Sequence, residues 1–214
     1  MDVVIIGAGG QGKVVGEALL ASETDRVVGY MDDRYKSLTK KDGIIFAPIT
    51  SAPMIKDILG PVKFMIAIGD NRTRWTMAKR LALPDDAYLT YIHPSAIVSP
   101  SATFGPGSVV MVRTVIQADA VIGRHAIINT GSVIEHDNCL GDFVHISPGA
   151  ILTGGVTIDA GAHIGAGAAV IPNVKIGEWS VVGAGTVVLD DLPPRCTAVG
   201  NPARVLQTKI IEGV

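Results

Sequence analysis

The N-terminal part of the chain alternates short apolar runs with amphipathic stretches. The apolar runs are VVIIG (3–7), VVGYM (27–31) and KFMIAIG (63–69), and helix-like stretches near 11–22, 51–59 and 71–83 lie between and after them. Strands that alternate with helices are typical of βαβ units. This pattern predicts a small parallel sheet with helices packed against it.

From about residue 92 the period changes. An apolar residue then stands at every sixth position without an insertion, and helical stretches are absent. In a chain that is 48% apolar, so many consecutive matches would arise by chance with a probability on the order of 10⁻⁵. The seventeen positions are Ile92, Val98, Phe104, Val110, Ile116, Ile122, Ile128, Ile134, Leu140, Ile146, Leu152, Ile158, Ile164, Val170, Ile176, Val182 and Val188.

A second regularity accompanies the first. Four residues after each apolar position from Val98 to Val182 stands Ala, Ser, Thr or Val, and Asn138 is the one exception. One aliphatic and one small residue in every six predict a β-helix, in which each unit is a short strand and a corner and the aliphatic side chain points inward. Three units would complete a triangular coil of eighteen residues. The period does not define the handedness of the helix.

We therefore expect two parts, an α/β part over 1–91 and an all-β part over 92–214. The aromatic content of 5% agrees with a narrow prism that seldom has room for a ring. Eighteen basic and twenty acidic residues, without a basic cluster, argue against nucleic acid as a partner. The N-terminus lacks a basic leader and no apolar stretch is long enough to span a membrane, so we expect a cytoplasmic protein.

The N-terminal strand runs into a glycine loop. Gly7, Gly9 and Gly12 have the spacing G-x-G-x-x-G between a predicted strand and a predicted helix, and Asp32 follows twenty residues later. Such a loop lets the backbone and a helix N-terminus approach a phosphate, while the carboxylate can accept hydrogen bonds from a ribose or a base. The α/β part is short for a full dinucleotide fold, so we expect a single nucleotide, and a nucleotide-sugar in particular. The alternative is a purely structural turn.

The third apolar run ends in IGDNRTR, which brings Gly69 and Asn71 to the carboxyl end of a parallel strand. Ligands of open α/β sheets bind at such ends, and these two residues are candidate substrate contacts. The alternative is a helix cap by Asp70 or Asn71 with arginines on a solvated helix face.

Of the five histidines, His136 has the most promising surroundings. It lies at a corner two residues after inward Ile134, with Glu135 and Asp137 on either side. One coil of eighteen residues places Gly154 directly above it, and a position without a side chain exposes backbone N–H groups to a developing oxyanion. The spacing alone leaves two interpretations open, a catalytic base and an outside-corner histidine.

The other histidines and both cysteines are expected to be structural or exposed. His125 occupies a corner without acidic neighbours, which favours a solvated surface residue. His145 and His163 are one coil apart, but a third ligand of the kind that zinc sites need is not apparent, and no metal is expected. Cys139 and Cys196 are far apart in the sequence and are expected to be buried thiols rather than a disulfide or a metal site.

The hexapeptide repeat resembles that of the hexapeptide acyltransferases, whose left-handed β-helices form trimers and bind acetyl-CoA between neighbouring prisms. The segment VGNPARVL (199–206) is similar to the one that closes many of these prisms. Together with the glycine-loop domain, these features indicate the family that includes the sialic acid O-acetyltransferases (NeuD type) and the N-acetyltransferases of UDP-4-amino sugars in bacillosamine synthesis (PglD type). The resemblance covers essentially the whole chain.

The resemblance implies a catalytic site. NTGSVIEHD (129–137) is very similar to the family segment NTSSVIEHE that carries the catalytic base, which places the base on His136, with Asp137 holding the imidazole and Glu135 as a substitute. It also implies that His145 lies near the acetyl group or the pantetheine arm. Acetyl-CoA contacts would come from Asn129, His145, Gly154, Gly155, Ala184, Gly200 and Arg204.

The resemblance further implies a small Rossmann-like domain, 1–91, that holds a UDP-sugar between the glycine loop and the acidic pair Asp32 and Asp33. The substrate contacts expected from this and from the sequence pattern are Gly9, Gly10, Gln11, Gly12, Asp32, Asp33, Gly69 and Asn71. Gln11 stands where these loops commonly have a histidine. Residues 92–214 would form the left-handed β-helix with a C-terminal closing segment.

The expected function is acetyl transfer from acetyl-CoA to the amino group of a nucleotide-linked amino sugar, for surface glycan or exopolysaccharide synthesis, by a homotrimer with active sites between subunits. Two alternatives remain: a sialic acid or polysaccharide-precursor O-acetyltransferase, and a non-catalytic β-helix scaffold or γ-carbonic-anhydrase-like metalloprotein.

Overall fold

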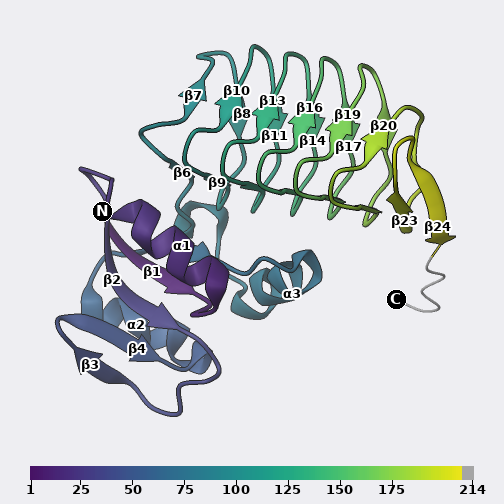
Figure 1. The fold of residues 1–214 in the computed structure, drawn as a ribbon. Helices are drawn as coiled ribbons and strands as arrows, with labels where there is room; N and C mark the ends of the chain where they lie inside the picture. The colour runs from purple at the N-terminus through teal and green to yellow at the C-terminus, as the bar shows by residue number, and fades with distance from the viewer. Residues whose placement is uncertain (209–214) are drawn as a thin grey trace.

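A computed structural model describes residues 1–208 of the chain. Its N-terminal part is a five-stranded sheet in the order β3-β4-β2-β1-β5, parallel except for β3 (Figure 1). The strands are β1 (Asp2–Ile6), β2 (Arg26–Met31), β3 (Thr39–Lys41), β4 (Ile44–Ala47) and β5 (Lys63–Ile66). The helices are α1 (Gly10–Leu19), α2 (Ala52–Leu59) and α3 (Asn71–Leu81), with 3-10 turns η1 (Ile49–Ser51) and η2 (Asp85–Ala87).

The predicted βαβ pattern is present, and the structure adds β3 and β4. The apolar run IIFA of β4, between Gly43 and Pro48, extends the parallel sheet beyond β2. The helix α3 begins where the side chain of Asp70 accepts a hydrogen bond from the Thr73 N–H at 2.8 Å, and ends at Ala82 in the left-handed conformation. The carboxyl ends of β1 and β5 therefore lie beside the starts of α1 and α3, as in other open α/β sheets.

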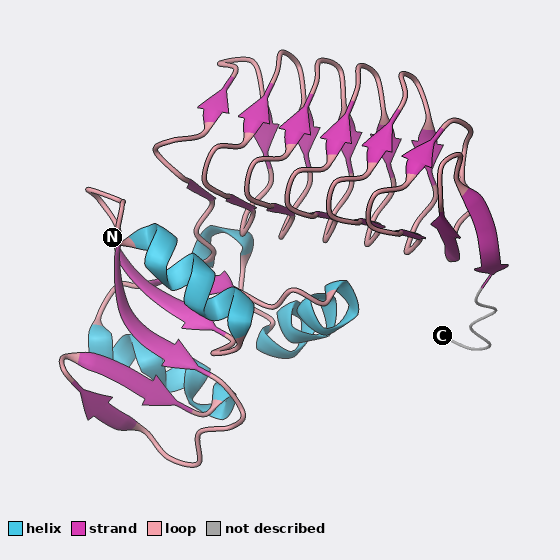
Figure 2. Ribbon diagram, in the orientation of Figure 1, coloured by secondary structure: helices cyan, strands magenta, loops and turns pink. Residues whose placement is uncertain are grey.

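The second part is a three-sided prism of two-residue parallel strands (Figures 1 and 2). The docked face, which carries the N-terminal sheet, contains β6 (Tyr91–Ile92), β9 (Val109–Val110), β12 (Ile127–Ile128), β15 (His145–Ile146), β18 (His163–Ile164) and β21 (Val181–Val182). A second face is called the stripe face, because the outward residues of its strands form an apolar stripe. It contains β7 (Ile97–Val98), β10 (Val115–Ile116), β13 (Val133–Ile134), β16 (Ile151–Leu152), β19 (Ala169–Val170) and β22 (Val187–Val188). The third face contains β8 (Thr103–Phe104), β11 (Val121–Ile122), β14 (Cys139–Leu140), β17 (Thr157–Ile158) and β20 (Lys175–Ile176).

The register is the one that the repeat predicts. Strands pair with the strand eighteen residues later, for example Val115 with Val133 and Val133 with Ile151. The second residue of each two-residue strand is the predicted apolar position, and from Val110 to Val188 these side chains are at most 2% exposed. At the open start of the prism Ile92 is 39% exposed. The hydrophobic period therefore determines the coil.

A closing hairpin ends the prism. The strand β23 (Cys196–Val199) continues the docked face in parallel with β21, and β24 (Arg204–Thr208) returns antiparallel to β23. This hairpin contains the predicted closing segment VGNPARVL. Among residues 1–208 no helix is long and apolar enough to cross a membrane.

The N-terminal sheet packs on the docked face through a shared apolar cluster. Val3, Ile5 and Met65 of the sheet belong to the same buried cluster as Val109 and Ile127 of the prism. The two parts are thus held together by burial of apolar surface.

Candidate active site

His136 and Asp137 lie at the corner that follows β13, between the stripe face and the third face. The Nδ1 atom of His136 lies 2.7 Å from Oδ2 of Asp137, and the two side chains are 62% and 65% exposed. Asp137 has a φ of +59°, a left-handed conformation that aspartate tolerates better than most side chains. This conformation turns the Asp137 carboxylate back toward the preceding imidazole, so Nε2 remains free for a reacting group.

Gly154 provides the space for this ring. A Cβ atom at Gly154 would lie 2.6 Å from Cε1 and 2.7 Å from Nε2 of His136, which is too close for any real side chain. The imidazole therefore rests on bare backbone one coil away, as the eighteen-residue spacing predicts. Gly155, with a φ of +70°, follows at the turn itself, where its N–H donates to the carbonyl of His136 at 2.9 Å.

Asn138 braces the corner from inside. Its side chain is 1% exposed, and its Nδ2 donates to the carbonyls of Glu135 at 2.7 Å and Thr153 at 2.9 Å. An amide is needed here because two carbonyls of successive coils converge, which explains the break in the small-residue rule. The backbone on either side of His136 is thus fixed by a buried hydrogen-bond network.

The electrostatics of the corner favour a basic imidazole. The hydrogen bond to Asp137, with a smaller contribution from the charge of Glu135, raises the pKa of His136 above its ordinary value. Asp137, rather than Glu135, makes the hydrogen bond to the ring. A carboxylate on Nδ1 also fixes the tautomer that leaves the Nε2 lone pair available as a proton acceptor.

A second polar group lies at the corner between the docked face and the stripe face. The Oδ1 of Asn129 accepts from the N–H of Thr130 at 2.8 Å, which orients its Nδ2 toward Nε2 of His145 at 3.2 Å. The Nδ1 of His145 in turn lies 3.2 Å from the carbonyl oxygen of Gly69. This pattern assigns His145 as the neutral tautomer with its proton on Nδ1, and leaves one N–H of Asn129 unused within the group.

Burial keeps this second histidine neutral. His145 is 8% exposed, and desolvation, together with the nearby His163 and Arg74, lowers its pKa to about 3. The rings of His145 and His163 are stacked face to face, with centroids 4.7 Å apart, and Nε2 of His163 lies 2.7 Å from Oγ of Ser147. Within the described part of the chain no three His, Cys, Asp or Glu side chains are grouped so as to hold a metal ion.

The residues expected to contact acetyl-CoA do not form one cluster in a single chain. Asn129, His145 and Ala184 belong to the docked face and to the corner that follows it, whereas Gly154 lies with His136 at the next corner around the prism. A strand of the stripe face separates the two groups. Gly200 and Arg204 belong to the closing hairpin, and both are exposed.

The glycine loop, the acidic pair and the end of β5 line one pocket of the N-terminal sheet. It has a volume of about 330 Å³ and includes six of the predicted substrate contacts, namely Gly9, Gly10, Gln11, Asp32, Asp33 and Gly69. The Nε2 of Gln11 is buried without a hydrogen-bond partner among the described residues. Asp32 accepts from the Ala8 N–H at 2.7 Å, which stabilises the loop and contributes to the lowered pKa of this carboxyl.

Two predicted substrate contacts have other roles in the structure. Gly12 is buried, and a Cβ there would lie 2.0 Å from the carbonyl oxygen of Gly7, so this glycine permits the packing of α1 against the loop. Asn71 is 7% exposed, and its Nδ2 donates to the carbonyls of Gly161 at 3.0 Å and Ala162 at 3.1 Å. The structure therefore places Asn71 in the contact between α3 and the prism, outside the pocket of the glycine loop.

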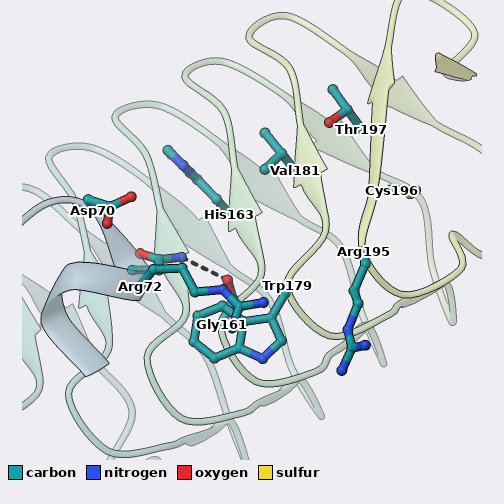
Figure 3. A pocket seen from close by; sticks show the side chains of 10 residues that line it. Asp70, Arg72, Gly161, His163, Trp179, Val181, Arg195, Cys196 and Thr197 are labelled. Carbon is teal, nitrogen blue, oxygen red and sulfur yellow. Dashed lines mark hydrogen bonds between the residues drawn. The ribbon is translucent and has the colours of Figure 1, made fainter. Parts of the chain in front are cut away.

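Another cavity, of about 260 Å³, lies between the start of α3 and the docked face (Figure 3). Trp179 forms part of its wall, and the guanidinium of Arg72 lies 3.9 Å from the centre of the Trp179 ring. His163, Val181 and Thr197 follow one another along its floor, from the middle of the prism toward the closing hairpin. The sequence pattern did not predict this cavity, because its two walls are about ninety residues apart in the chain.

Two expectations for the remaining side chains were wrong. His125 is 1% exposed, stacks on Phe143 with ring centroids 5.0 Å apart and packs edge-on against Tyr88, so it is a buried residue. Burial lowers its pKa to about 4. Cys139 is exposed on the third face because it is the outward residue of β14, whereas Cys196 is buried as expected.

Comparison with known proteins identifies the family. The family model described as the PglD N-terminal domain matches residues 2–81. The UDP-N-acetylbacillosamine N-acetyltransferase of Bacillus subtilis (strain 168) is 46% identical over 110 residues, an alignment that spans 51% of each protein. The acetyltransferase domain of PglB from Neisseria gonorrhoeae FA1090, solved with acetyl coenzyme A, is 37% identical, with a TM-score of 0.83 over 96% of this chain and 98% of that one.

A third relative aligns over almost the entire chain. PerB from Caulobacter crescentus, solved in complex with CoA and GDP-perosamine, is 40% identical, with a TM-score of 0.87 over 97% of this chain and 98% of that one. This likeness confirms the predicted fold class, an α/β domain followed by a left-handed parallel β-helix. The chain belongs to the NeuD/PglD-type family of hexapeptide-repeat, acetyl-CoA-dependent acyltransferases.

Proposed function

We propose that this protein transfers the acetyl group of acetyl-CoA to the amino group of a nucleotide-linked 4-amino sugar, with His136 as the general base. The observation that carries this proposal is the exposed His136–Asp137 pair resting on Gly154, in which Nε2 of His136 has no hydrogen-bond partner among residues 1–208. A neutral amine is already a competent nucleophile, so the enzyme mainly has to position it and to accept its proton.

The reaction follows from this geometry. The amine nitrogen attacks the thioester carbonyl carbon, and Nε2 of His136 takes the proton that the nitrogen loses. The C–S bond of the tetrahedral intermediate then breaks, and the proton passes from the imidazolium to the departing thiolate, which gives the amide and CoA. Asp137 stabilises the imidazolium while the proton resides on it.

Asn129 is our candidate for the donor to the oxyanion. Its Oδ1 is occupied by Thr130, one amide hydrogen faces His145, and the other is unused within the group. His145 acts by orienting this amide, because its own Nδ1 proton is directed to Gly69 and its Nε2 accepts. The backbone N–H groups near Gly154 are further candidates.

The separation of the two polar groups supports an active site shared between copies of the chain. His136 lies at the edge where the stripe face meets the third face. Asn129 and His145 lie at the opposite edge, where the stripe face meets the docked face. The outward residues of this face are apolar throughout, and Ile97 is 69% and Ile151 42% exposed, with Val115, Val133, Ala169 and Val187 completing the row. A homotrimer that packs these faces together would bring His136 of one subunit to Asn129 and His145 of the next.

The two cavities suggest where the substrates bind. The pocket of the glycine loop suits the nucleotide, because the α1 N-terminus and bare backbone favour a diphosphate. The cavity beside Trp179 leads from His163 along the docked face to the closing hairpin, and its mixed polar and apolar lining suits the pantetheine arm of acetyl-CoA. The relatives solved with ligands contain CoA together with GDP-perosamine, and acetyl coenzyme A.

The test is an activity assay with matched acceptors. The protein is given acetyl-CoA and a UDP- or GDP-linked 4-amino-4,6-dideoxy sugar, or the same compound with a hydroxyl at C4, and free thiol and acetylated product are measured. We expect product with the amino compounds only, and none with the His136→Ala variant. Turnover of the hydroxyl compound but not of the amine would replace N-acetylation by O-acetylation, and activity retained by His136→Ala would exclude His136 as the base.

A further inference from the structure

Arg74 of α3 is a buried cation that the proposed reaction does not use directly. Its side chain is 1% exposed, and within residues 1–208 no carboxylate lies within 4 Å of its guanidinium. Main-chain carbonyl oxygens and the side-chain oxygen of Asn71 satisfy all of its donors. Burying a charge in this way is costly unless each donor is well placed, so the arrangement depends on geometry.

The prism supplies one set of these carbonyls. Nε of Arg74 donates to the carbonyl of His125 at 2.8 Å, and Nη2 donates to that of Phe143 at 2.8 Å. These two oxygens are eighteen residues apart and occupy the same corner on successive coils. Asn71 extends the series, because its Nδ2 donates to the carbonyl of Gly161, the next residue in that column. Two side chains in the first turn of α3, Asn71 and Arg74, thus donate to carbonyls at the same corner of three successive coils.

The loop between β5 and α3 supplies the other set. Nη1 of Arg74 donates to the carbonyl of Ile68 at 2.8 Å and to that of Gly69 at 3.2 Å. Ile68 and Gly69 form part of the lining of the nucleotide pocket, and these two residues are called its rim below. One planar guanidinium therefore joins the rim of this pocket to fixed points on the β-helix.

The chemistry of the side chain makes this link specific. Arginine presents five N–H donors in a rigid plane, whereas lysine presents three on a freely rotating ammonium group. The apolar cluster that includes Val3, Ile5, Val109 and Ile127 already holds the two parts together without Arg74. The hydrogen bonds of the guanidinium define where the rim lies relative to the prism, because hydrogen bonds are directional. Apolar burial is non-directional and does not define this position to a fraction of an ångström.

We infer that Arg74 is a positioning residue, which fixes the rim of the nucleotide pocket on the β-helix and so sets where a nucleotide-linked acceptor presents its amino group. This inference rests on the proposed function. A sugar held by its nucleotide reaches the base only if pocket and prism keep their relative position, and a misplacement of about 1 Å can lower the rate about 100-fold. A small acceptor without a nucleotide does not use the pocket and does not depend on this link.

The experiment compares the two kinds of acceptor in Arg74→Lys and Arg74→Met. We expect kcat/KM with the nucleotide-linked amino sugar to fall about 100-fold, and the low rate with a nucleotide-free 4-amino sugar and the Kd for acetyl-CoA to change less than about threefold. Lys79→Met, an exposed change on the same helix, is the matched control and should leave both rates unchanged. The near-isosteric Asn71→Asp keeps an oxygen for Arg74 but loses the donor to Gly161, and should reproduce the pattern in a milder form.

Amide hydrogen exchange provides a readout that does not depend on the acceptor. Exchange of residues 67–74 should become faster in Arg74→Lys, while the coils over 109–188 keep their protection. An equal loss of activity with both acceptors, or unchanged exchange over 67–74, would overturn the inference and leave Arg74 as a stabilising residue only. If the unmodified protein does not prefer the nucleotide-linked acceptor, the proposed function fails, and the exchange data still decide whether Arg74 holds the rim.

Discussion

Gly154→Ala is a one-carbon change that tests the position of the proposed base. The added Cβ would lie 2.6 Å from Cε1 and 2.7 Å from Nε2 of His136. Carbon atoms in contact are about 3.5–4.0 Å apart, so the ring has to move by about 1 Å. The hydrogen bond from Nδ1 to Asp137 measures 2.7 Å, and a movement of this size lengthens or misaligns it. We expect kcat to fall about 100-fold.

The backbone itself should accept the change. Pro172 occupies the same place as Gly154 on the next coil, and His136 and Ala118 occupy it on the two preceding coils, so a Cβ is compatible with this corner. The free energy of unfolding should therefore change by less than about 1 kcal/mol, since Gly→Ala also reduces the entropy of the unfolded chain. Ala118→Gly is the matched control, because it alters the flexibility of the corner one coil before His136 without crowding the ring. This variant should leave kcat within about threefold.

The assay combines steady-state kinetics with a thermal melt and a titration of the His136 ring by NMR. A folded Gly154→Ala protein should show a low kcat, an unchanged Kd for acetyl-CoA and a His136 pKa closer to the ordinary histidine value. Full activity in a folded variant would show that the reaction does not require the ring to rest on Gly154, and the geometric basis for His136 as the base would be lost.

Three further predictions follow from the same structure. His136→Ala should abolish turnover while the Kd for acetyl-CoA, measured by calorimetry, stays within about threefold. Asp137→Asn, which keeps a residue that tolerates the left-handed conformation, should lower kcat about 10- to 100-fold. Asp137→Asn should also shift the acid limb of the pH–rate profile to lower pH, because the hydrogen bond that raises the pKa of His136 is lost. Glu135→Gln should have a much smaller effect on kcat and on this profile. A larger effect of Glu135→Gln than of Asp137→Asn would assign the orienting role to Glu135. Acid should destabilise the protein through His125, because burial lowers the pKa of this histidine to about 4. Between about pH 6.5 and pH 4 this side chain binds a proton in the unfolded chain but not in the folded chain. The free energy of unfolding should therefore fall as the pH drops from 6.5 to 4, by up to about 3 kcal/mol from this group. His125→Phe, which copies Phe143 one coil above, should flatten this part of the curve of unfolding free energy against pH, and an unchanged slope would refute the assignment.

The sequence by itself determined the coil. The aliphatic period of six admits one inward side chain per strand, and any other register would expose a row of Ile, Val and Leu, so the eighteen-residue stacking and the place of His136 over Gly154 follow from spacing. The glycine loop was equally predictable, because its glycines serve a backbone conformation and a close approach that need no distant partner. Asp137 and Glu135 could not be separated by spacing, since both flank His136, and the choice depends on the left-handed corner that turns Asp137 toward the ring.

Only the tertiary structure decided which face of the prism is covered. A six-residue repeat makes the three faces locally alike, so the period does not distinguish the face that receives the N-terminal sheet. Docking on one face buried His125, although its corner resembles exposed ones. It also brought Arg74 and Asn71 into the contact with the prism, whereas the sequence left open substrate contacts, a helix cap or a solvated helix face. It also placed His145 against Gly69, because long-range packing, and not local sequence, brings residues 76 positions apart into contact.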